Sequence, residues 1–432
     1  MMTHAEHLLQ LIGQSPSCFH VVRNLETRLQ AEGYQALKPG ERWALKPGGS
    51  YYVTKNGSSL LAFRLPQARP SGFTLAAAHS DSPTFKIKEN AEKSSAGCIQ
   101  LSTEKYGGML MSTWFDRPLS VAGRVCVLEN GRLRTKLVDL DRDLLVIPSV
   151  AIHMNRAAND GFKIMPNVDT LPLFGCAQSA GSFLSLVAEA AGVEKEAIAG
   201  HDLFLYVRNG GTVLGARNEL LLAPRLDDLE CVYALTEGFL GAADSEAVPA
   251  LCVFDNEEVG STTKQGAASN LLRDTLRRIA LGLGLGEEDF LRMISNSFLV
   301  SADNAHAQHP NHPEYSDGLN VPRLNGGVVV KFNANQRYTT DAVSCGLFRA
   351  VCREAGVPVQ VYANRSDLPG GSTLGSIATT KVCAASVDIG LAQLAMHSCC
   401  ETAGVQDLED LVRAMRVYYA KAFRFEDAEV HF

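Results

Sequence analysis

Two adjacent glutamates, Glu257 and Glu258, come just after a short apolar run. The run, residues 248–253, has the length and composition of a buried strand and is bounded by polar residues. Because ligands in open α/β sheets bind in the crevice outside the carboxyl ends of the strands, both carboxylates lie over a predicted cleft. Taken alone, such an acidic stretch is more often a solvated turn. A catalytic or metal-binding role is favoured here because other polar residues also come directly after apolar runs.

A histidine and an aspartate follow a second apolar run, residues 73–78, in the stretch A-H-S-D-S-P. Residues two positions apart on an extended strand point to the same face, so the side chains of His79 and Asp81 lie on the same side of the chain. Asp81 can therefore accept the second ring N–H of His79, which is a common support for a metal-bound imidazole. Packing or a turn is the simpler role for either residue alone.

Three further residues extend this pattern. Asp227 begins a predicted helix that runs to about residue 241, where N-capping is its simpler role. Asp303 follows the apolar run 295–300 in a loop rich in histidine, and His397 comes just before the last predicted helix. Each signal is weak singly, and the prediction depends on their combination.

Together these strand-end residues form a set of nitrogen and oxygen ligands without sulfur. The set is His79, Asp227, Glu258, Asp303 and His397. Imidazole suits zinc, and several carboxylates suit two divalent ions that share a bridging carboxylate. Two such ions clamp a water, polarise a carbonyl and lower the pKa of the water. Glu257 is then free to act as the general base.

A lysine lies within another apolar run, residues 328–332. A buried ammonium without a partner is costly, so Lys331 requires an anion. An acidic substrate side chain would supply one. The alternatives are an internal carboxylate or a lysine that reaches the surface.

The elements that must position these residues are typical of a mixed α/β fold. Residues 1–89 and 222–432 predict a catalytic domain with a central sheet flanked by helices, including a hairpin whose turn is Asn56-Gly57. Residues 90–221 predict an inserted, mainly β domain with one helix near 176–192. Within it, His153 ends an apolar run, and the sequence alone favours an ordinary loop histidine.

Composition narrows the classes of function. The 432 residues carry a net charge of -7, which gives no basic surface for nucleic acid. The 11 cysteines include no C-x-x-C pair, which favours a reducing compartment over a disulfide framework or a Cys-ligated zinc. Neither a signal peptide nor an apolar run of ~20 residues is found, so we expect a cytoplasmic protein that does not bind membranes.

Five stretches, in this order, resemble motifs of the aspartyl aminopeptidase family of dizinc aminopeptidases. They are H-S-D-S-P, P-R-L-D-D-L, F-D-N-E-E-V-G-S, S-A-D-N-A-H-A-x-H-P-N and L-A-M-H-S. The likeness also covers S-P-S-x-F-H near the N-terminus, Y-G-G and T-W-F-D-R-P-L at 106–119, and V-K-F-N-A-N-Q-R-Y at 330–338. It therefore extends over essentially the whole chain.

The resemblance implies a zinc-exopeptidase-like catalytic domain that removes N-terminal Asp or Glu from peptides. One ion would be held by His79 and Asp303 and the other by Glu258 and His397, with Asp227 bridging. Both ions would be Zn²⁺, with Co²⁺ or Mn²⁺ as alternatives at one site.

The resemblance also implies roles for residues around the ions. Asp81 would orient His79, Glu257 would be the base, and Lys331 would meet the acidic side chain of the substrate. His153 would reach the active site of a neighbouring subunit in a homo-oligomer, a tetrahedral dodecamer. The other implied substrate contacts are His309, Tyr338, Gly371 and Ser372.

Two motifs depart from the family pattern. P-C-G-S/T-T appears here as P-G-G-S-T with Gly370 in place of Cys, and Y-G-G-G-x-W appears as Y-G-G-M-L-M with Met109 and Met111. By resemblance, the first departure would alter the substrate pocket and the second would alter a contact between subunits. The competing interpretations are a metal-dependent deacylase or carboxypeptidase on the same scaffold, and a non-catalytic scaffold protein. The complete ligand set and Glu257 count against the latter.

Overall fold

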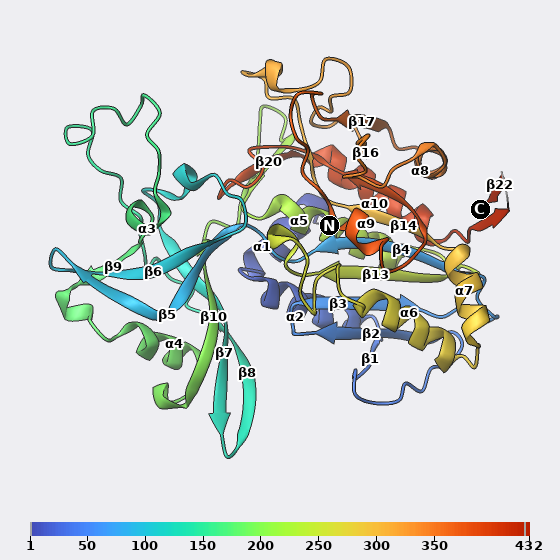
Figure 1. Cartoon of the computed structure of the whole chain (residues 1–432), viewed down its shortest axis with the longest axis horizontal. Coiled ribbons are helices and arrows are strands. Elements are labelled where there is room, and N and C mark those ends of the chain that lie inside the picture. The colour runs from blue at the N-terminus through green and yellow to red at the C-terminus, as the bar shows by residue number, and fades with distance from the viewer. Residues whose placement is uncertain (1, 427–428) are drawn as a thin grey trace.

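A nine-stranded mixed sheet forms the centre of the structure, a computed structural model that describes residues 2–426 and 429–432 (Figure 1). In spatial order its strands are β1 (Gln35–Ala36), β2 (Ser50–Lys55), β3 (Ser59–Arg64), β13 (Val248–Phe254), β4 (Phe73–His79), β14 (Phe298–Ala302), β18 (Ala385–Gly390), β16 (Val328–Phe332) and β17 (Val359–Ala363). The four strands β13, β4, β14 and β18 run parallel to one another. Their carboxyl ends therefore meet at one edge of the sheet.

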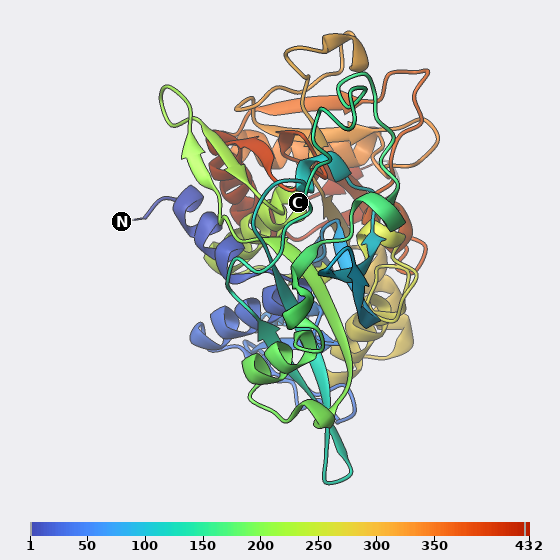
Figure 2. The ribbon, with the colours of Figure 1, turned by 90° about the vertical axis from the view of Figure 1, so that its left-hand side faces the viewer.

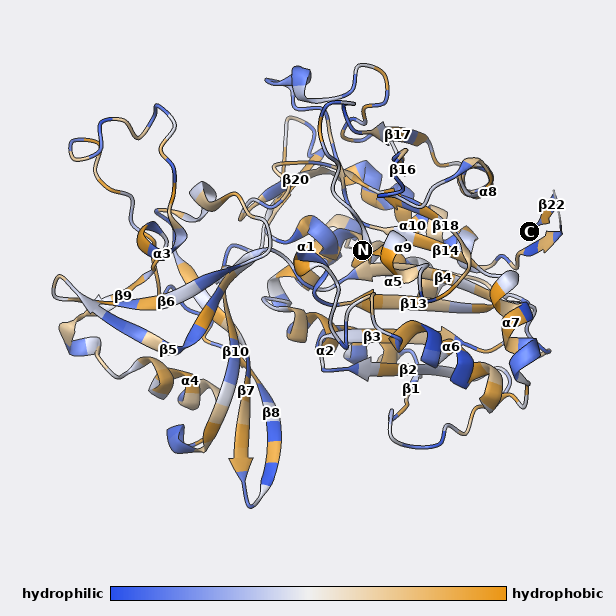
Figure 3. Cartoon of the chain, in the orientation of Figure 1, coloured by the Kyte–Doolittle hydropathy of each residue, from blue (hydrophilic) through white to orange (hydrophobic). Residues whose placement is uncertain are grey.

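The central strands are mainly apolar because helices cover both faces of the sheet. Every residue of β4 and of β13 is buried, and both strands are coloured mainly as hydrophobic in Figure 3. Continuous apolar runs of this kind are typical of parallel strands that are buried on both sides. The hairpin of β2 and β3 turns at Asn56 and Gly57, whose φ angles of 58° and 67° are those of a type I′ turn.

The helices form two layers. One face of the sheet packs against α1 (His4–Gln14), α2 (Cys18–Ala31), α5 (Leu226–Gly241), α8 (Ala342–Ala355) and α10 (Val405–Tyr419). The other face packs against α6 (Leu271–Gly282), α7 (Glu287–Ser295) and α9 (Leu374–Ala378). Successive residues of β4 alternate between these two cores, with Ala76 in the first and Ala77 in the second. The mixed α/β fold class predicted from the sequence is confirmed.

The inserted segment forms a separate six-stranded sheet. Its strands, in spatial order, are β8 (Arg132–Asp139), β7 (Leu119–Glu129), β10 (Ile198–Val207), β5 (Thr84–Ser95), β6 (Cys98–Tyr106) and β9 (Leu173–Cys176). The short α3 (Pro166–Asp169) precedes β9, and α4 (Phe183–Ala191) adds Phe183 and Val187 to the apolar core of this domain. The β7–β8 hairpin extends away from the rest of the molecule in both views (Figures 1 and 2).

The expected boundary between residues 89 and 90 falls inside β5. Only residues 80–83 separate β4 of the central sheet from β5 of the inserted sheet. Because this connection is so short, the sequence has no linker that would mark where the chain passes from one sheet to the other. We propose residues 84–207 as the extent of the inserted domain.

A smaller five-stranded sheet lies next to the carboxyl ends of β14 and β18. Its strands are β11 (Thr212–Leu214), β12 (Leu220–Ala223), β20 (Glu401–Gly404), β19 (Ala392–Leu394) and β15 (Ala305–His306). Strands β15 and β19 begin within three residues of the ends of β14 and β18. The chain ends in the hairpin of β21 (Arg424–Glu426) and β22 (Glu429–His431). None of the described helices is long and apolar enough to cross a membrane.

Candidate metal centre

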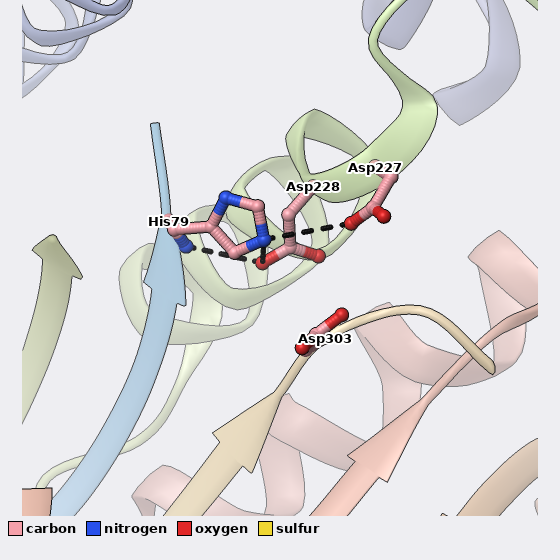
Figure 4. A group of neighbouring side chains, drawn as sticks. All are labelled: His79, Asp227, Asp228 and Asp303. Atoms are coloured by element: carbon pink, nitrogen blue, oxygen red, sulfur yellow. Dashed lines mark hydrogen bonds and ion pairs between the residues drawn. The ribbon is translucent and has the colours of Figure 1, made fainter. Parts of the chain in front are cut away.

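The residues selected from the sequence lie at the carboxyl edge of the central sheet. His79 is the last residue of β4, Asp303 follows β14 directly, and Glu258 lies in a single 3₁₀ turn after β13. Asp227 lies at the first turn of α5, just beyond β12, and His397 lies between β19 and β20. Figure 4 shows His79, Asp227, Asp228 and Asp303 converging from β4, α5 and β14.

Asp227 is the centre of two clusters of potential ligands. Ligand atoms of His79, Asp227, Asp228 and Asp303 lie within 4.8 Å of one another, as do those of Asp227, Glu258 and His397. Oδ1 of Asp227 is 3.5 Å from Nε2 of His79, and Oδ2 is 3.3 Å from Nε2 of His397. The two oxygens of one carboxylate thus face two different histidines, which is the arrangement of a bridging ligand.

The donor set fits divalent cations. Oδ1 of Asp227 and Oε1 of Glu258 are buried and have no hydrogen-bond partner among residues 2–426 and 429–432. A buried carboxylate oxygen without a partner is costly, so the cluster lacks positive charge. Burial, followed by the charge of Asp227, raises the pKa of Glu258 well above its ordinary value. Two ions bound to Asp227, with His79 and Asp303 on one side and Glu258 and His397 on the other, would remove this excess of negative charge.

Asp228 is a site residue that the sequence analysis did not select. The peptide bond between Asp227 and Asp228 is cis. Oδ2 of Asp228 accepts the backbone N–H of His79 at 3.0 Å and lies 3.9 Å from Nε2 of that residue. The doubled aspartate of P-R-L-D-D-L was the available signal, but helix capping accounts equally well for either member.

Asp81 supports both the histidine and the glutamate pair. Nδ1 of His79 lies 3.0 Å from the backbone carbonyl of Asp81 and 3.5 Å from its carboxylate. The carboxylate accepts the backbone N–H groups of Glu257 at 3.1 Å and Glu258 at 3.2 Å, and the hydroxyl of Tyr106 at 2.7 Å. The closer contact with the imidazole therefore comes from the main chain, and the carboxylate holds the turn that carries the glutamates.

Glu257 lies beside the ligands. A side-chain oxygen of Glu257 lies within 4.8 Å of ligand atoms of His79 and Glu258. Burial and the neighbouring carboxylates, Asp303 foremost, raise the pKa of Glu257 to about 8. A carboxyl group with a pKa near the working pH can both take up and return a proton.

Lys331 is buried, with 1% of its surface exposed, and has internal partners. Its Nζ donates to the backbone carbonyls of Asp303 at 2.8 Å and Asn304 at 3.2 Å, and lies 3.9 Å from Oδ2 of Asp303. It also lies 5.1 Å from the centre of the Tyr338 ring. Although burial alone would lower it, the charge of Asp303 keeps the pKa of Lys331 above its usual value. The ammonium is thus fixed next to a ligand.

His306 is a second candidate site residue that the sequence analysis did not select. It belongs to β15 and packs edge-on against Tyr362, with ring centres 5.9 Å apart. Tyr362 in turn packs against Tyr338 at 6.3 Å. The spacing from Asp303 was the only signal in the sequence.

The other expected substrate contacts lie on exposed segments. Gly371 and Ser372 are exposed in the loop before α9, and His309 is exposed and packs against His312 with ring centres 5.4 Å apart. A Cβ atom added to Gly370 would lie 2.5 Å from Oδ1 of Asn364. A larger side chain at this departure from the family motif would therefore require the side chain of Asn364 to move.

The inserted domain approaches the candidate metal centre at Gly107, the residue that follows β6. Gly107 has a φ of +76°, and a Cβ atom added there would lie 3.1 Å from Cβ of Glu258. Met109 and Met111 pack against the core of the inserted domain. His153, by contrast, is exposed in the loop 148–165 and is not brought to the cluster within one chain.

Comparison with known proteins gives one family. The model of the family described as aminopeptidase I zinc metalloprotease (M18) matches residues 11–419. A protein of Clostridium acetobutylicum named probable M18 family aminopeptidase 2 is 44% identical over 424 residues, which are 96% of this chain and 98% of that protein. A protein of Pseudomonas aeruginosa PAO1 with the same name is 42% identical, over 96% and 97% of the two chains.

Solved structures agree with these sequence matches. A chain in the cryo-EM structure of a complex of Ape4 and Nbr1 superposes with a TM-score of 0.93 and 35% identity, over 96% of this chain and 85% of that one. The structure described as the dodecamer of S. cerevisiae mApe1 superposes with a TM-score of 0.84 and 27% identity, over 96% of both chains.

Proposed function

This chain belongs to the aminopeptidase I (M18) zinc metalloprotease family, and from that premise we propose that it removes N-terminal Asp or Glu from peptides at a two-metal centre. The observation that carries the proposal is the position of Asp227, whose two oxygens face His79 and His397 from opposite sides. Glu257 lies beside the resulting clusters. The ions are proposed to be Zn²⁺, with Co²⁺ or Mn²⁺ as alternatives at one site.

The residues of the chain have separate tasks in the proposed reaction. When bound, the ions supply polarisation of the scissile carbonyl and a water of lowered pKa. Glu257 accepts a proton from the attacking water and passes it to the leaving amine, so one carboxyl group serves first as base and then as acid. Asp81 holds the backbone N–H groups of Glu257 and Glu258 during these steps.

Lys331 supports the preference for acidic substrates. Two of its three N–H donors bond to the backbone carbonyls of Asp303 and Asn304. The remaining donor, on a buried ammonium 3.9 Å from Oδ2 of Asp303, is proposed to meet a substrate carboxylate, and a charge-assisted hydrogen bond of this kind contributes about 1.5–3 kcal/mol. Tyr338 borders the ammonium, and His306 packs against Tyr362, which in turn packs against Tyr338. A neutral substrate would leave this donor without a partner.

The inserted domain supports assembly into a homo-oligomer. Its loop 148–168 exposes apolar side chains around His153, and Met154 is 83% exposed. The others are Val150, Ile152, Phe162, Met165 and Val168. Clustered apolar side chains on a surface mark a contact with another protein. A second copy of the chain would bury them and bring His153 to the neighbouring active site, in an assembly such as the dodecamer described for S. cerevisiae mApe1.

The decisive experiment is a substrate panel with metal-reconstituted protein. It compares aspartyl, glutamyl, leucyl and alanyl peptides with their N-acetylated forms, before and after chelation. We expect free aspartyl and glutamyl peptides to be hydrolysed in preference to leucyl and alanyl peptides, with the activity lost on chelation and restored by Zn²⁺. Cleavage of the acetyl group would instead indicate a deacylase, and release of C-terminal residues a carboxypeptidase.

A further inference from the structure

We propose that Glu401 is a positioning residue that holds the bridging ligand Asp227 and the ligand His397 in a fixed relation. The proposal rests on the function proposed above, because it concerns ions bound at that centre. Glu401 is 1% exposed and lies outside both ligand clusters. It therefore acts on the ligands and not on substrate.

The contacts of Glu401 are with main-chain groups of two ligand residues. Oε2 accepts the backbone N–H of Asp227 at 3.0 Å, and Oε1 accepts the backbone N–H of His397 at 2.6 Å. Each oxygen of the carboxylate thus serves a different ligand. A carboxylate is the side chain that can do this, because both of its oxygens accept hydrogen bonds.

The five-stranded sheet brings the three residues together. Glu401 begins β20 and is paired with Ala223, the last residue of β12. The chain continues from β12 through Arg225 to Asp227, and it reaches β20 from β19 through His397. The two ligands therefore belong to separate connections at neighbouring strand ends, and Glu401 is the side chain that joins them.

Both connections pass through backbone conformations that side chains other than glycine rarely adopt. Arg225 has a φ of 59° and His397 has a φ of 66°. Such residues persist only where the surroundings hold them in place. The two hydrogen bonds from Glu401 act next to these positions, and they fix the direction in which each ligand side chain leaves the main chain.

Two other ligands, His79 and Glu258, are held in a similar way, which makes the role of Glu401 part of a pattern. Asp81 accepts the backbone N–H groups of Glu257 and Glu258, and Asp228 accepts that of His79. In each case a buried carboxylate holds the main chain of a metal-binding segment. Glu401 differs from the other two because its partners come from different segments, so its loss would allow Asp227 and His397 to move apart.

The test compares Glu401→Gln with a matched control, Glu230→Gln. Glutamine keeps the shape of Glu401 but turns an N–H₂ group towards one of the two backbone N–H donors, which breaks one hydrogen bond. Glu230 is also fully buried, and among residues 2–426 and 429–432 its side chain has one hydrogen bond, from Nδ2 of Asn304 at 3.4 Å. The control therefore changes a buried carboxyl group that has no hydrogen bond to a ligand.

The readouts are the dissociation constant for Zn²⁺, measured by competition with a chromogenic chelator, and the absorption spectrum of the Co²⁺ form. Loss of an outer partner of a metal ligand weakens metal binding about 10- to 100-fold, and we expect this range for Glu401→Gln together with an altered Co²⁺ spectrum. We expect Glu230→Gln to match the wild type. Equal affinity for Zn²⁺ in Glu401→Gln and wild type, or an equal loss in both variants, would overturn the proposal.

Two further measurements distinguish a folding defect, a failure of the role of Glu401 and a failure of the proposed function. If Glu401→Gln does not fold, as judged by its thermal midpoint, Glu401→Asp decides the question, because aspartate keeps the charge but is one methylene too short to reach both donors. We expect weaker Zn²⁺ binding in this variant too, and full affinity would overturn the role of Glu401. A wild-type protein that bound no Zn²⁺ would instead overturn the proposed function.

Discussion

The carboxyl edge of the central sheet and the loop 148–168 of the inserted domain differ in how complete they are within one chain. At the sheet edge, Asp227 and Asp303 are buried, and carboxylates accept the backbone N–H groups of every proposed ligand except Asp303. In the loop, His153 and the neighbouring Met154 are exposed to solvent. The first region lacks only the proposed metal ions, whereas the second lacks the neighbouring subunit proposed above.

This difference separates two steps that an activity assay would otherwise combine. Metal binding is expected to be a property of the single chain, because both ligand clusters come from one chain. Turnover is expected to depend on assembly, because His153 has no access to those clusters within its own chain.

The largest effect is expected for Glu257→Gln. Glutamine keeps the size of the side chain but cannot accept the proton of the attacking water, and loss of a general base lowers kcat about 10²- to 10⁴-fold. Metal content, measured by atomic absorption, should remain that of the wild type. Glu258→Ala is the contrasting variant and should lose metal. Normal turnover of Glu257→Gln with its metal bound would remove Glu257 from the mechanism.

The next largest effect is expected for His153→Ala. If His153 stabilises the transition state in a neighbouring subunit, its loss lowers kcat about 10²-fold without changing metal content. Arg156→Ala, an exposed change in the same loop, is the control and should be close to wild type.

Mixing inactive variants sharpens the same comparison. Assemblies refolded from His153→Ala and Glu257→Gln chains would contain some sites with an intact Glu257 and an intact neighbouring His153. We expect such mixtures to recover part of the activity that each variant lacks. Mixtures as inactive as their components would place His153 outside the neighbouring site.

A smaller and selective effect is expected for Lys331→Met. The contact between Nζ and the backbone carbonyl of Asp303 is lost for every substrate, so a common loss of kcat/KM is expected. An additional loss of roughly 10- to 100-fold is expected for aspartyl over alanyl peptides, because only the former pair with the ammonium. Equal losses on both peptides would limit Lys331 to holding Asp303.

The smallest effect is expected where the two regions meet, at Gly107. Gly107→Ala places a Cβ atom 3.1 Å from Glu258 and should lower kcat/KM about three- to tenfold through displacement of that ligand. Gly131→Ala is a matched control, because Gly131 also has a positive φ of +70° but has open space around its Cβ position. Both changes should cost about 1–2 kcal/mol of stability. Equal activity in the two variants would show that the contact with Glu258 is unimportant.

The central sheet and its ligand-bearing ends could be predicted from sequence because the signals are local. The strands 73–79 and 248–254 are unbroken apolar runs, and polar residues follow them at once. By contrast, β18 and the five-stranded sheet were not predicted, since their strands are short and gain stability only from pairing across long sequence distances. His397 was therefore selected only from its place just before the last predicted helix together with the other residues, and its pairing with Glu258 depended on family resemblance.

The supporting residues of the centre were harder to predict than the ligands. Asp228 adjoins Asp227, and a sequence cannot tell which of two aspartates caps a helix and which faces a metal. Glu401 begins a strand, with no sequence feature that indicates its two backbone partners. Main-chain donors carry no side-chain identity, so hydrogen bonds to them leave no pattern in the residues.

The inserted domain leaves the central fold just after His79, whereas β11 and β12 separate its last strand, β10, from Asp227. In mechanical terms, His79 is the nearer anchor point of a lever whose far end is the β7–β8 hairpin. Force applied at the tip of that hairpin, near Gly131, is delivered to His79 through the short connection 80–83. A single-molecule pulling experiment from Gly131 should therefore distort the metal centre before the central sheet unzips, and bound Zn²⁺ should raise the force at the first rupture.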